Sequence, residues 1–466
     1  MRQWWPVPAV IALATTLAIA LGPGYAGYDA SWSLVWGREI AAGSLPSYQS
    51  PVAPTPHPLA NAVAAALSPL GDGGEVALVA LTFLSFAALL AGALAVTARL
   101  SWWPAGVVVA LVLGTRGQLD REVAFASIDL PFLALVLWAS VLEARRSLAG
   151  TPVLALLLLA GLLRPEAWLL SMAYLAVLAR ARPRRELRVP LALTIGAPLL
   201  WALSDLLVTG DALHSLTGTR DLAADLDRPT GFSTALHAVP ESLADLIGPL
   251  PLAAGLLGLC AGLLLARRAV AIPLLICAGS MVTFLAIGIA GLPVLVRYLL
   301  LPVCMLAVAA GIGLALPWLT PAGRPRNAAF AVAGTIAVLL VASVPQAVDD
   351  VRNARSFTAA RGQVHRDLRA LISQPAFIDA ALRCVQLRVP DFRARPVLLI
   401  EGSIDASRVV VGNLADGERG LLLTYASPKA GLVFTLGAPG EAPLQALPAG
   451  GKVVARNRSW LAGAAC

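Results

Sequence analysis

The chain has 466 residues, of which 58% are hydrophobic and only 13% are charged, and its mean hydropathy is +0.77. An ordinary soluble domain has an apolar share of about 45–50%, so this composition excludes that class and indicates a membrane protein. The formal net charge is +8, and arginine carries almost all of it, because Lys429 and Lys452 are the only lysines. Such a basic balance reflects membrane topology rather than nucleic-acid binding, for which no interleaved basic and aromatic patch is present.

Apolar runs predict an α-helical polytopic membrane protein with about eleven transmembrane helices between residues 1 and 348. The predicted spans are 7–24, 74–98, 102–114, 129–143, 151–164, 166–180, 188–209, 246–266, 270–291, 293–317 and 327–346. The spans at 102–114, 129–143 and 151–164 are short, which suits broken, tilted or partly re-entrant helices.

The arginine distribution predicts the orientation of these helices. With a cytoplasmic N-terminus, every connection on the inner side carries arginine, as the positive-inside rule requires. The inner arginines are Arg99, Arg145, Arg146, Arg180, Arg182, Arg184, Arg185, Arg188, Arg267, Arg268, Arg324 and Arg326. Segments 25–73, 115–128 and 210–245 and the tail from 349 then lie outside, in a cell (inner or plasma) membrane.

The first apolar segment has a second interpretation, a cleaved signal peptide. Arg2 precedes its apolar core, and Ala26 is a small residue near a possible cleavage site. Cleavage would leave ten spans and would remove the helical anchor of the residues that follow.

The tail, residues 349–466, differs in composition and is expected to form a small extracytoplasmic α+β domain beside the membrane domain of residues 1–348. Helical spacing is seen in Arg352–Ile372 and Pro375–Leu387. Short apolar runs separated by Gly, Pro and Asp predict strands. These runs are Pro396–Ile400, Arg408–Val411, Gly420–Tyr425, Gly431–Leu436 and Lys452–Arg456.

Two of the five cysteines, Cys384 and Cys466, fall in this tail. Because the tail is placed in an oxidising compartment, they are expected to form a disulfide, with two unpaired thiols as the alternative. The other three, Cys260, Cys277 and Cys304, lie in apolar spans and are expected to be core residues.

An aspartate just beyond the first span, Asp29, is the leading catalytic candidate, because lipid-borne substrates hold their head groups at this depth. Apolar residues follow it with helical spacing and predict a helix lying on the membrane surface, ended by Gly43 and Pro46. These residues are Trp32, Val35, Trp36 and Ile40. The alternative role for Asp29 is an N-cap, which is compatible with an ionised carboxylate.

Further polar residues stand at the outer ends of other spans. His57 closes a proline-rich segment and suits substrate binding or a simple loop contact. Asp129 opens a span and is either a second catalytic carboxylate or another cap, while Asp120, Arg121 and Glu122 could form a solvated loop.

Arg164 and Glu166 interrupt an apolar hairpin, where an arginine can bind a lipid phosphate or anchor the hairpin at the interface. Arg297, followed by Tyr298, lies just inside a span and needs an anionic partner, either a protein carboxylate or a lipid phosphate. The sequence contains no P-loop, HExxH or zinc spacing, and its GxGxxG match at residues 22–27 follows an apolar span rather than a strand, so cytosolic ATP or NAD chemistry is unsupported and no cofactor is predicted.

Three short motifs resemble the GT-C superfamily of multi-span glycosyltransferases, of the protein-mannosyltransferase and lipid A aminoarabinose-transferase kind. The first runs from Tyr28-Asp29 through Trp36-Gly37-Arg38-Glu39-Ile40 to His57-Pro58-Leu59 and is similar to the first outer loop of that superfamily. The others are Ala126-Ser127-Ile128-Asp129-Leu130-Pro131 and Gly161-Leu162-Leu163-Arg164-Pro165-Glu166-Ala167-Trp168. The chain departs from some members in having no Asp-Glu pair at Asp29, which leaves the activity and a divalent metal open.

The resemblance implies transfer of a sugar from a polyprenyl-phosphate donor to an extracytoplasmic glycan, lipid or protein. Asp29 would take the proton of the acceptor hydroxyl, Arg164 or Arg297 would hold the donor phosphate, and Asp129 would orient the acceptor or support the site. One alternative is a polysaccharide polymerase or ligase that relies on the arginines and histidines of the loop 210–245. The other is a non-enzymatic transporter or assembly factor of the envelope.

Overall fold

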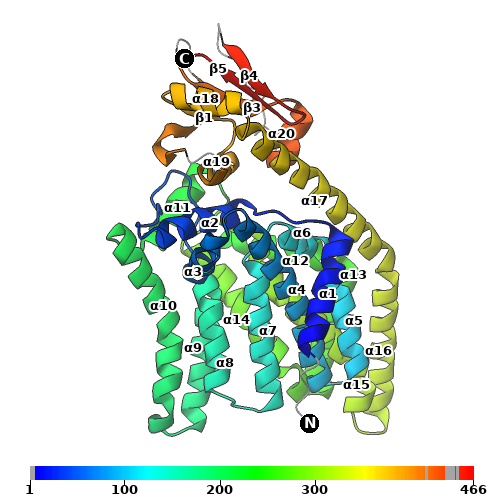
Figure 1. Ribbon diagram of the computed structural model, residues 1–466. Helices are drawn as coiled ribbons and strands as arrows, with labels where there is room; N and C mark the ends of the chain where they lie inside the picture. The colour runs from blue at the N-terminus through cyan, green and yellow to red at the C-terminus, as the bar shows by residue number, and fades with distance from the viewer. Residues whose placement is uncertain (1–5, 402–403, 415–417, 436–446, 448–450) are drawn as a thin grey trace.

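The computed structural model describes residues 6–401, 404–414, 418–435, 447 and 451–466. A bundle of long helices forms the body of the molecule, and a smaller α/β unit stands on one end of it (Figure 1). Helix α1 (Pro6–Leu21) begins toward the opposite end of the bundle from the C-terminus (Figure 1). We call the end that carries the small unit the upper end.

Each predicted span coincides with a helix, and all but one agree to within a few residues, because the apolar runs are long enough to define helices locally. The exception is the span at 293–317, which begins seven residues before its α-helix. The helices are α1 (Pro6–Leu21), α4 (Gly73–Leu100), α5 (Trp103–Gly114), α7 (Asp129–Arg145), α8 (Thr151–Leu163), α9 (Glu166–Ala181), α10 (Arg188–Thr209), α13 (Pro249–Leu265), α14 (Arg267–Ile289), α15 (Leu300–Leu319) and α16 (Arg324–Ala342). Short 3-10 turns, η2 (Arg184–Leu187) and η3 (Val296–Leu299), precede α10 and α15. Helix α15 is buried on nearly all sides, as expected of a helix that is apolar all round.

By length and composition, five helical segments of the described chain are long and apolar enough to cross a membrane. These are Gly73–Leu100, Arg184–Thr209, Arg267–Ile289, Val296–Leu319 and Arg324–Ile372. Two bent pairs raise the number to seven, and shorter apolar helices, among them α5 and α8, accompany them. The chain is a multi-pass membrane protein, and the number of eleven crossings stays a prediction.

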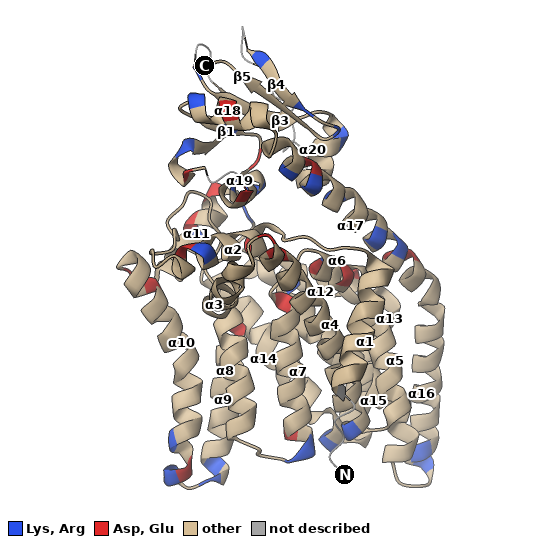
Figure 2. Ribbon diagram, viewed as in Figure 1, with Lys and Arg blue, Asp and Glu red and all other residues tan. Residues whose placement is uncertain are grey.

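Basic residues gather at the lower end of the bundle, near the connection between α9 and α10, the end of α7 and the connection between α15 and α16 (Figure 2). The arginine-rich connections identified in the sequence therefore share one end. The small α/β unit occupies the other end.

Short helices lie across the upper end and join the spans. They are α2 (Tyr28–Ala41), α3 (Pro58–Leu67), η1 (Ser68–Leu70), α6 (Gly117–Ala124), α11 (His214–Asp225) and α12 (Phe232–Ile247). The prediction that α2 lies on the membrane surface is wrong. Trp32 and Trp36 are buried in a cluster with Tyr48 and Ile400, so protein covers the apolar stripe except at Ile40, which stays exposed. Gly37 permits the close crossing with α3, because a Cβ there would lie 2.5 Å from the Ala64 carbonyl carbon.

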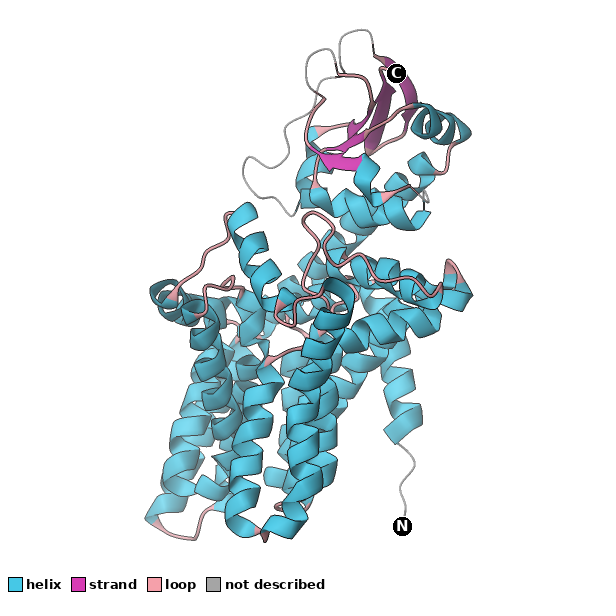
Figure 3. Ribbon diagram, turned by 90° about the vertical axis from the view of Figure 1, so that its left-hand side faces the viewer, coloured by secondary structure: helices cyan, strands magenta, loops and turns pink. Residues whose placement is uncertain are grey.

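The C-terminal unit contains one five-stranded sheet, and the described strands all belong to it (Figure 3). Its strand order is β2-β1-β3-β5-β4, with β1 parallel to β2 and β3 and with antiparallel pairs at β3–β5 and β5–β4. The elements are α17 (Val344–Ile372), α18 (Pro375–Arg383), β1 (Leu387–Val389), η4 (Phe392–Ala394), α19 (Arg395–Glu401), η5 (Ala406–Arg408), β2 (Val409–Val411), β3 (Leu421–Tyr425), α20 (Pro428–Thr435), β4 (Lys452–Arg456) and β5 (Trp460–Ala464).

Two predicted strands of this unit are helices. Pro396–Ile400 lies in α19, where Ile400 packs against α2, and Gly431–Thr435 lies in α20, while residue 436 lies outside the described residues. A short apolar run does not distinguish a buried strand from a buried helix. A signal for α20 was present, because Ser427 followed by Pro428 is a typical helix start and the Ser427 hydroxyl accepts from the Ala430 N–H.

The boundary predicted between 348 and 349 falls within α17, a continuous helix that leads from the bundle into the C-terminal unit. Ion pairs then join the unit to the upper end of the bundle. Arg369 of α17 pairs with Glu75 of α4 and, at 3.4 Å, with Glu401 of α19. Arg38 of α2 donates a 2.8 Å hydrogen bond to the Ile400 carbonyl. The unit is thus held to the loops of the upper end.

The predicted disulfide is confirmed, because Cys384 and Cys466 are bonded to each other across 82 residues of sequence. In the chain-entropy model a loop of this length stabilises the unit by about 4 kcal/mol. We therefore expect Cys384→Ser to accelerate non-reducing proteolysis of the C-terminal unit and to leave the bundle intact. Cys260→Ser, which removes a free cysteine of α13, is the matched control. Equal proteolysis of both variants would contradict the prediction.

Candidate active site

A cavity of about 580 Å³ lies at the upper end of the bundle. Its walls come from the start of α2, the loop before α3, the turn between α8 and α9, the upper half of α10, α11 and the segment around η3. Six of the seven residues proposed from the sequence for catalysis or substrate binding line it: Asp29, His57, Arg164, Glu166, Arg297 and Tyr298. The seventh, Asp129, lines a small adjoining void together with Arg164 and Arg297. Residues spread over 270 positions of sequence are thus brought together.

Asp29 is held by an ion pair with Arg297. The Arg297 Nη1 donates to Asp29 Oδ2 at 3.0 Å, and the two side chains keep 25% (Asp29) and 31% (Arg297) of their exposure. Helix α2 begins at Tyr28, its N-cap is Gly27, and the Asp29 side chain makes no cap hydrogen bond. The N-cap alternative is therefore wrong. The protein carboxylate that Arg297 needs at this depth is Asp29, 268 residues away.

Neighbouring backbone contacts fix the start of α2. The Gly27 N–H donates to the Phe125 carbonyl at 2.9 Å, and the Ala26 N–H donates to Glu75 Oε1 at 2.8 Å. The Ser31 hydroxyl donates back to the Ala26 carbonyl at 3.0 Å. The segment that leads into the helix of Asp29 is therefore anchored to both α4 and the turn after α6.

The charge states of Asp29 and His57 follow from this environment. Burial raises the pKa of the Asp29 carboxyl, but the positive charges around it, above all the hydrogen-bonded Arg297 guanidinium, together lower the pKa by more, so that the net value lies below the ordinary 3.8. Burial lowers the pKa of His57 to about 3. His57 is thus a neutral imidazole at physiological pH. Its ring lies against Trp201 at 5.6 Å, and its buried Nδ1 has no hydrogen-bond partner in the described part of the chain.

Arg164 is the centre of a buried ion cluster. It forms ion pairs with Asp129 and, at 2.8 Å, with Glu166, and the three side chains keep only 6%, 2% and 10% of their exposure. Its guanidinium also lies 4.6 Å from the ring centre of Tyr298. Two carboxylates therefore compensate its charge. Asp129 accepts from the Ser127 hydroxyl at 3.1 Å and does not cap α7, whose N-cap is Ile128.

Arg228 is a cavity residue that the sequence indicated only for the alternative of a polysaccharide polymerase or ligase. It lines the same cavity, between α11 and α12, and no ion pair within 4.0 Å joins it to a carboxylate of the described residues. It is a half-buried cation whose charge a ligand could neutralise. Its only sequence signal was its place in the polar segment 210–245.

Two tryptophans were also missed as site residues. Trp168 and Trp201 line the cavity with their rings 5.6 Å apart and perpendicular. The Trp201 indole N–H donates to the Ser215 hydroxyl at 2.8 Å, and Ser215 in turn donates to Asp205 at 2.9 Å. This chain of hydrogen bonds ties α10 to α11 and fixes the aromatic wall. An apolar run such as α10 does not reveal whether its tryptophan, Trp201, faces lipid or a cavity.

Of the loop residues that favoured a polymerase or ligase, only Arg228 lines this cavity. The Arg220 Nε–H donates to the Ala290 carbonyl at 2.6 Å, and His237 bonds to Ser233 on its own helix. His214 lines a neighbouring cavity. Within the described residues, no group of three or more His, Cys, Asp and Glu side chains could hold a metal ion.

Comparison with known proteins gives structural matches without a sequence match. No protein-family model matches the chain, and no curated protein does. ArnT from Cupriavidus metallidurans bound to undecaprenyl phosphate is similar to the whole chain, with a TM-score of 0.58, 13% identity, and coverage of 100% of this chain and 98% of ArnT. Its apo state gives a TM-score of 0.53 and 14% identity over 98% and 97% of the two chains. The chain described here therefore has the fold of ArnT over its full length.

Proposed function

We propose that this protein is a membrane glycosyltransferase that moves a sugar from a polyprenyl-phosphate donor to an acceptor hydroxyl at the upper end of the bundle. The observation that carries the proposal is the content of the upper cavity, where an ionised carboxylate, Asp29, faces the same space as an unpaired cation, Arg228. Transfer from a lipid phosphate needs both a proton acceptor and a charge that stabilises the leaving phosphate. The ArnT of the same fold was crystallised with undecaprenyl phosphate, which supports a lipid of this class.

In the proposed reaction, Asp29 is the general base. The acceptor hydroxyl gives its proton to an Asp29 carboxylate oxygen, and its own oxygen forms the new bond to the anomeric carbon of the sugar. The bond between that carbon and the phosphate oxygen breaks with inversion, and the polyprenyl phosphate leaves with the electron pair. General-base assistance of this kind contributes roughly 10²–10⁴-fold to a rate.

The other cavity residues have supporting roles in this proposal. Arg228 stabilises the phosphate as its negative charge grows, and Arg297 holds the Asp29 carboxylate in place. Trp168 and Trp201 form an apolar wall for the sugar or the lipid, and the neutral His57 offers a hydrogen bond to a substrate hydroxyl. Arg164, with its charge compensated by Asp129 and Glu166, positions Tyr298 at the cavity.

A deletion strain tests the proposed function. We expect its envelope glycans, lipids or glycoproteins to lose one sugar and its pool of the corresponding lipid-linked sugar to increase, both measured by mass spectrometry. Purified protein in liposomes that contain a polyprenyl-phosphate sugar should transfer that sugar to material extracted from the deletion strain. An unchanged envelope and an unchanged lipid-linked pool would reject the proposal.

Arg228→Gln is expected to raise the KM for the lipid donor by about tenfold or more, because one charge-assisted hydrogen bond to the phosphate contributes roughly 1.5–3 kcal/mol. The protein should fold normally, since no carboxylate of the described residues is left unpaired. Arg220→Gln, a change in the same outer segment at a side chain outside the cavity, is the control. An unchanged donor KM in Arg228→Gln would remove this residue from the site.

We also propose that the upper end faces the extracytoplasmic side, with the N-terminus in the cytoplasm. The arginine-rich connections at the lower end support this orientation. In a Cys260→Ala background, a cysteine at Val453 of β4 should react with an impermeant thiol reagent in intact cells. A cysteine at Ala322, between α15 and α16, should react only after permeabilisation. The reverse pattern would overturn the orientation.

A further inference from the structure

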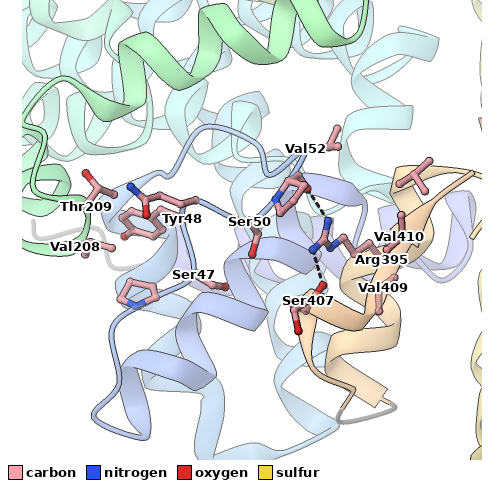
Figure 4. A pocket seen from close by; sticks show the side chains of 15 residues that line it. Ser47, Tyr48, Ser50, Val52, Val208, Thr209, Arg395, Ser407, Val409 and Val410 are labelled. Atoms are coloured by element: carbon pink, nitrogen blue, oxygen red, sulfur yellow. Dashed lines mark hydrogen bonds between the residues drawn. The ribbon is translucent and has the colours of Figure 1, made fainter. Parts of the chain in front are cut away.

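A second cavity, of about 560 Å³, lies between the loop before α3, the end of α10 and the C-terminal unit (Figure 4). We call it the groove. The loop contributes residues 46–52, and α10 contributes Val208 and Thr209. The C-terminal unit contributes Arg395, η5 residues and β2, which is an edge strand of the sheet. None of the residues proposed for catalysis lies in it.

The polar side chains of the groove are mostly neutral. They are hydroxyls and an amide, supplied by Ser47, Tyr48, Gln49, Ser50, Thr209 and Ser407, and they alternate with valines and prolines. Hydroxyl and amide groups are suited to sugar hydroxyls, and the apolar side chains are suited to the C–H faces of a sugar ring. The single charged lining residue, Arg395, is 3% exposed and directed at carbonyl groups of the protein.

A third cavity, of about 340 Å³, adjoins both the groove and the candidate active site. It shares the wall residues 48–52 with the groove. It shares the wall residues Pro54, Thr55, Ser215, Thr219 and Leu222 with the cavity that contains Asp29. One ligand-sized cavity is typically about 300–1,000 Å³. Three adjoining cavities therefore suit a chain of several units rather than a single sugar.

Direct contacts hold the two walls of the groove together. Arg395 donates to the Pro51 carbonyl of the loop at 3.1 Å and to the Ala406 carbonyl of the C-terminal unit at 2.6 Å. The Tyr28 hydroxyl, one residue before Asp29, donates to the Val52 carbonyl. The groove is thus preformed, which lowers the entropic cost of binding a flexible chain. The hydrogen bond from Tyr28 also joins the loop of the groove to the start of α2, the helix that contains Asp29.

We propose that the groove binds the glycan chain of the acceptor and directs its terminal hydroxyl toward Asp29 by way of the third cavity. This inference rests on the proposed function and names the acceptor class, a glycan of several sugars. An extended peptide is less suited to the groove, because β2 has only three residues and offers few backbone groups for strand addition.

Two matched variants test the inference. Val410→Trp fills the groove from its edge strand, whereas Val453→Trp adds the same bulk to β4, the opposite edge strand of the same sheet. The purified full chain is assayed with glycan extracted from the deletion strain, separated into a long fraction and fragments of one or two sugars. In Val410→Trp we expect the ratio of kcat/KM for the long fraction to that for the fragments to fall by about tenfold or more, through KM. In Val453→Trp the ratio should match the wild type.

The outcomes separate this inference from the proposed function. If the wild type transfers sugar and the two variants have equal ratios, the groove is not the acceptor site although the glycosyltransferase stands. A wild type that uses a peptide or a lipid without a glycan overturns the inference in the same way. If the wild type transfers nothing, binding of the long fraction by native mass spectrometry still decides the question. Weaker binding in Val410→Trp than in Val453→Trp would support the groove, and equal binding would reject it.

Discussion

Asp29→Asn is expected to lower glycosyl transfer by roughly 100-fold or more while the protein folds and is expressed normally. Asparagine keeps the size of the side chain but cannot accept the proton of the acceptor hydroxyl. The substitution should not disturb the start of α2, because the Asp29 side chain makes no cap hydrogen bond there. The measurement is kcat with a saturating polyprenyl-phosphate sugar, alongside the apparent melting temperature in detergent.

Two variants control for the lost ion pair. Arg297→Gln breaks the same pair but leaves the carboxylate, so it should retain more activity than Asp29→Asn if the carboxylate is the base. Asp72→Asn removes an acidic side chain that is 93% exposed, and this variant should have wild-type activity. Full activity of Asp29→Asn at matched expression would make Asp29 a structural residue.

The pH dependence gives a second check on Asp29. Its pKa lies below 3.8 and that of His57 is about 3, so Asp29 stays ionised and His57 stays neutral from about pH 5 to pH 8. Neither group should therefore produce a change of kcat/KM within that range. An acidic loss of activity with a midpoint above about pH 5 that is absent from Asp29→Glu would contradict these charge states.

Arg164→Leu is expected to destabilise the bundle strongly, by about 3–5 kcal/mol, because it leaves the carboxylates of Asp129 and Glu166 buried without a cation. Most of the variant protein should be lost during purification, and fluorescence-detected size-exclusion chromatography at increasing temperature measures the effect. This outcome differs from that of Arg228→Gln, which should fold and lose donor affinity.

Neutralising the whole cluster distinguishes stability from phosphate binding. The triple variant Arg164→Leu, Asp129→Asn, Glu166→Gln removes the buried charges together and should recover much of the folded protein, since neutral replacement of a buried ion cluster is often tolerated. If Arg164→Leu instead folds as well as the wild type and only its donor KM rises, Arg164 contacts the phosphate directly and the structural role assigned to it is wrong.

Local hydropathy is enough to predict the helices of the bundle, because an apolar run of about 20 residues defines a membrane helix. Cysteine content predicts the bond between Cys384 and Cys466, since the tail holds no other cysteine and is expected to lie in an oxidising compartment. The polar residues at the ends of spans are visible in the sequence because they interrupt or follow these apolar runs, and six of the seven candidates line one cavity.

The tertiary structure alone decided which of these polar residues are paired and which are free. Arg164 and Arg297 were equal candidates for the phosphate, and only the fold shows that carboxylates already neutralise both. Arg228 has no comparable partner among the described residues. Its significance depends on a cavity formed by segments more than 100 residues apart. Ion pairs of this range leave no local pattern in a sequence.

The C-terminal unit illustrates the same limit in its backbone. The sequence pattern predicts the helix 352–372 and three of the strands correctly. It does not predict β1 or β5, and it predicts a strand at Pro396–Ile400, which is helical. Strand formation depends on partners across the sheet, and Ile400 is helical because α19 packs on α2 of the bundle. Local composition determined where the chain is apolar, and only the packing of distant segments decided what each apolar run becomes.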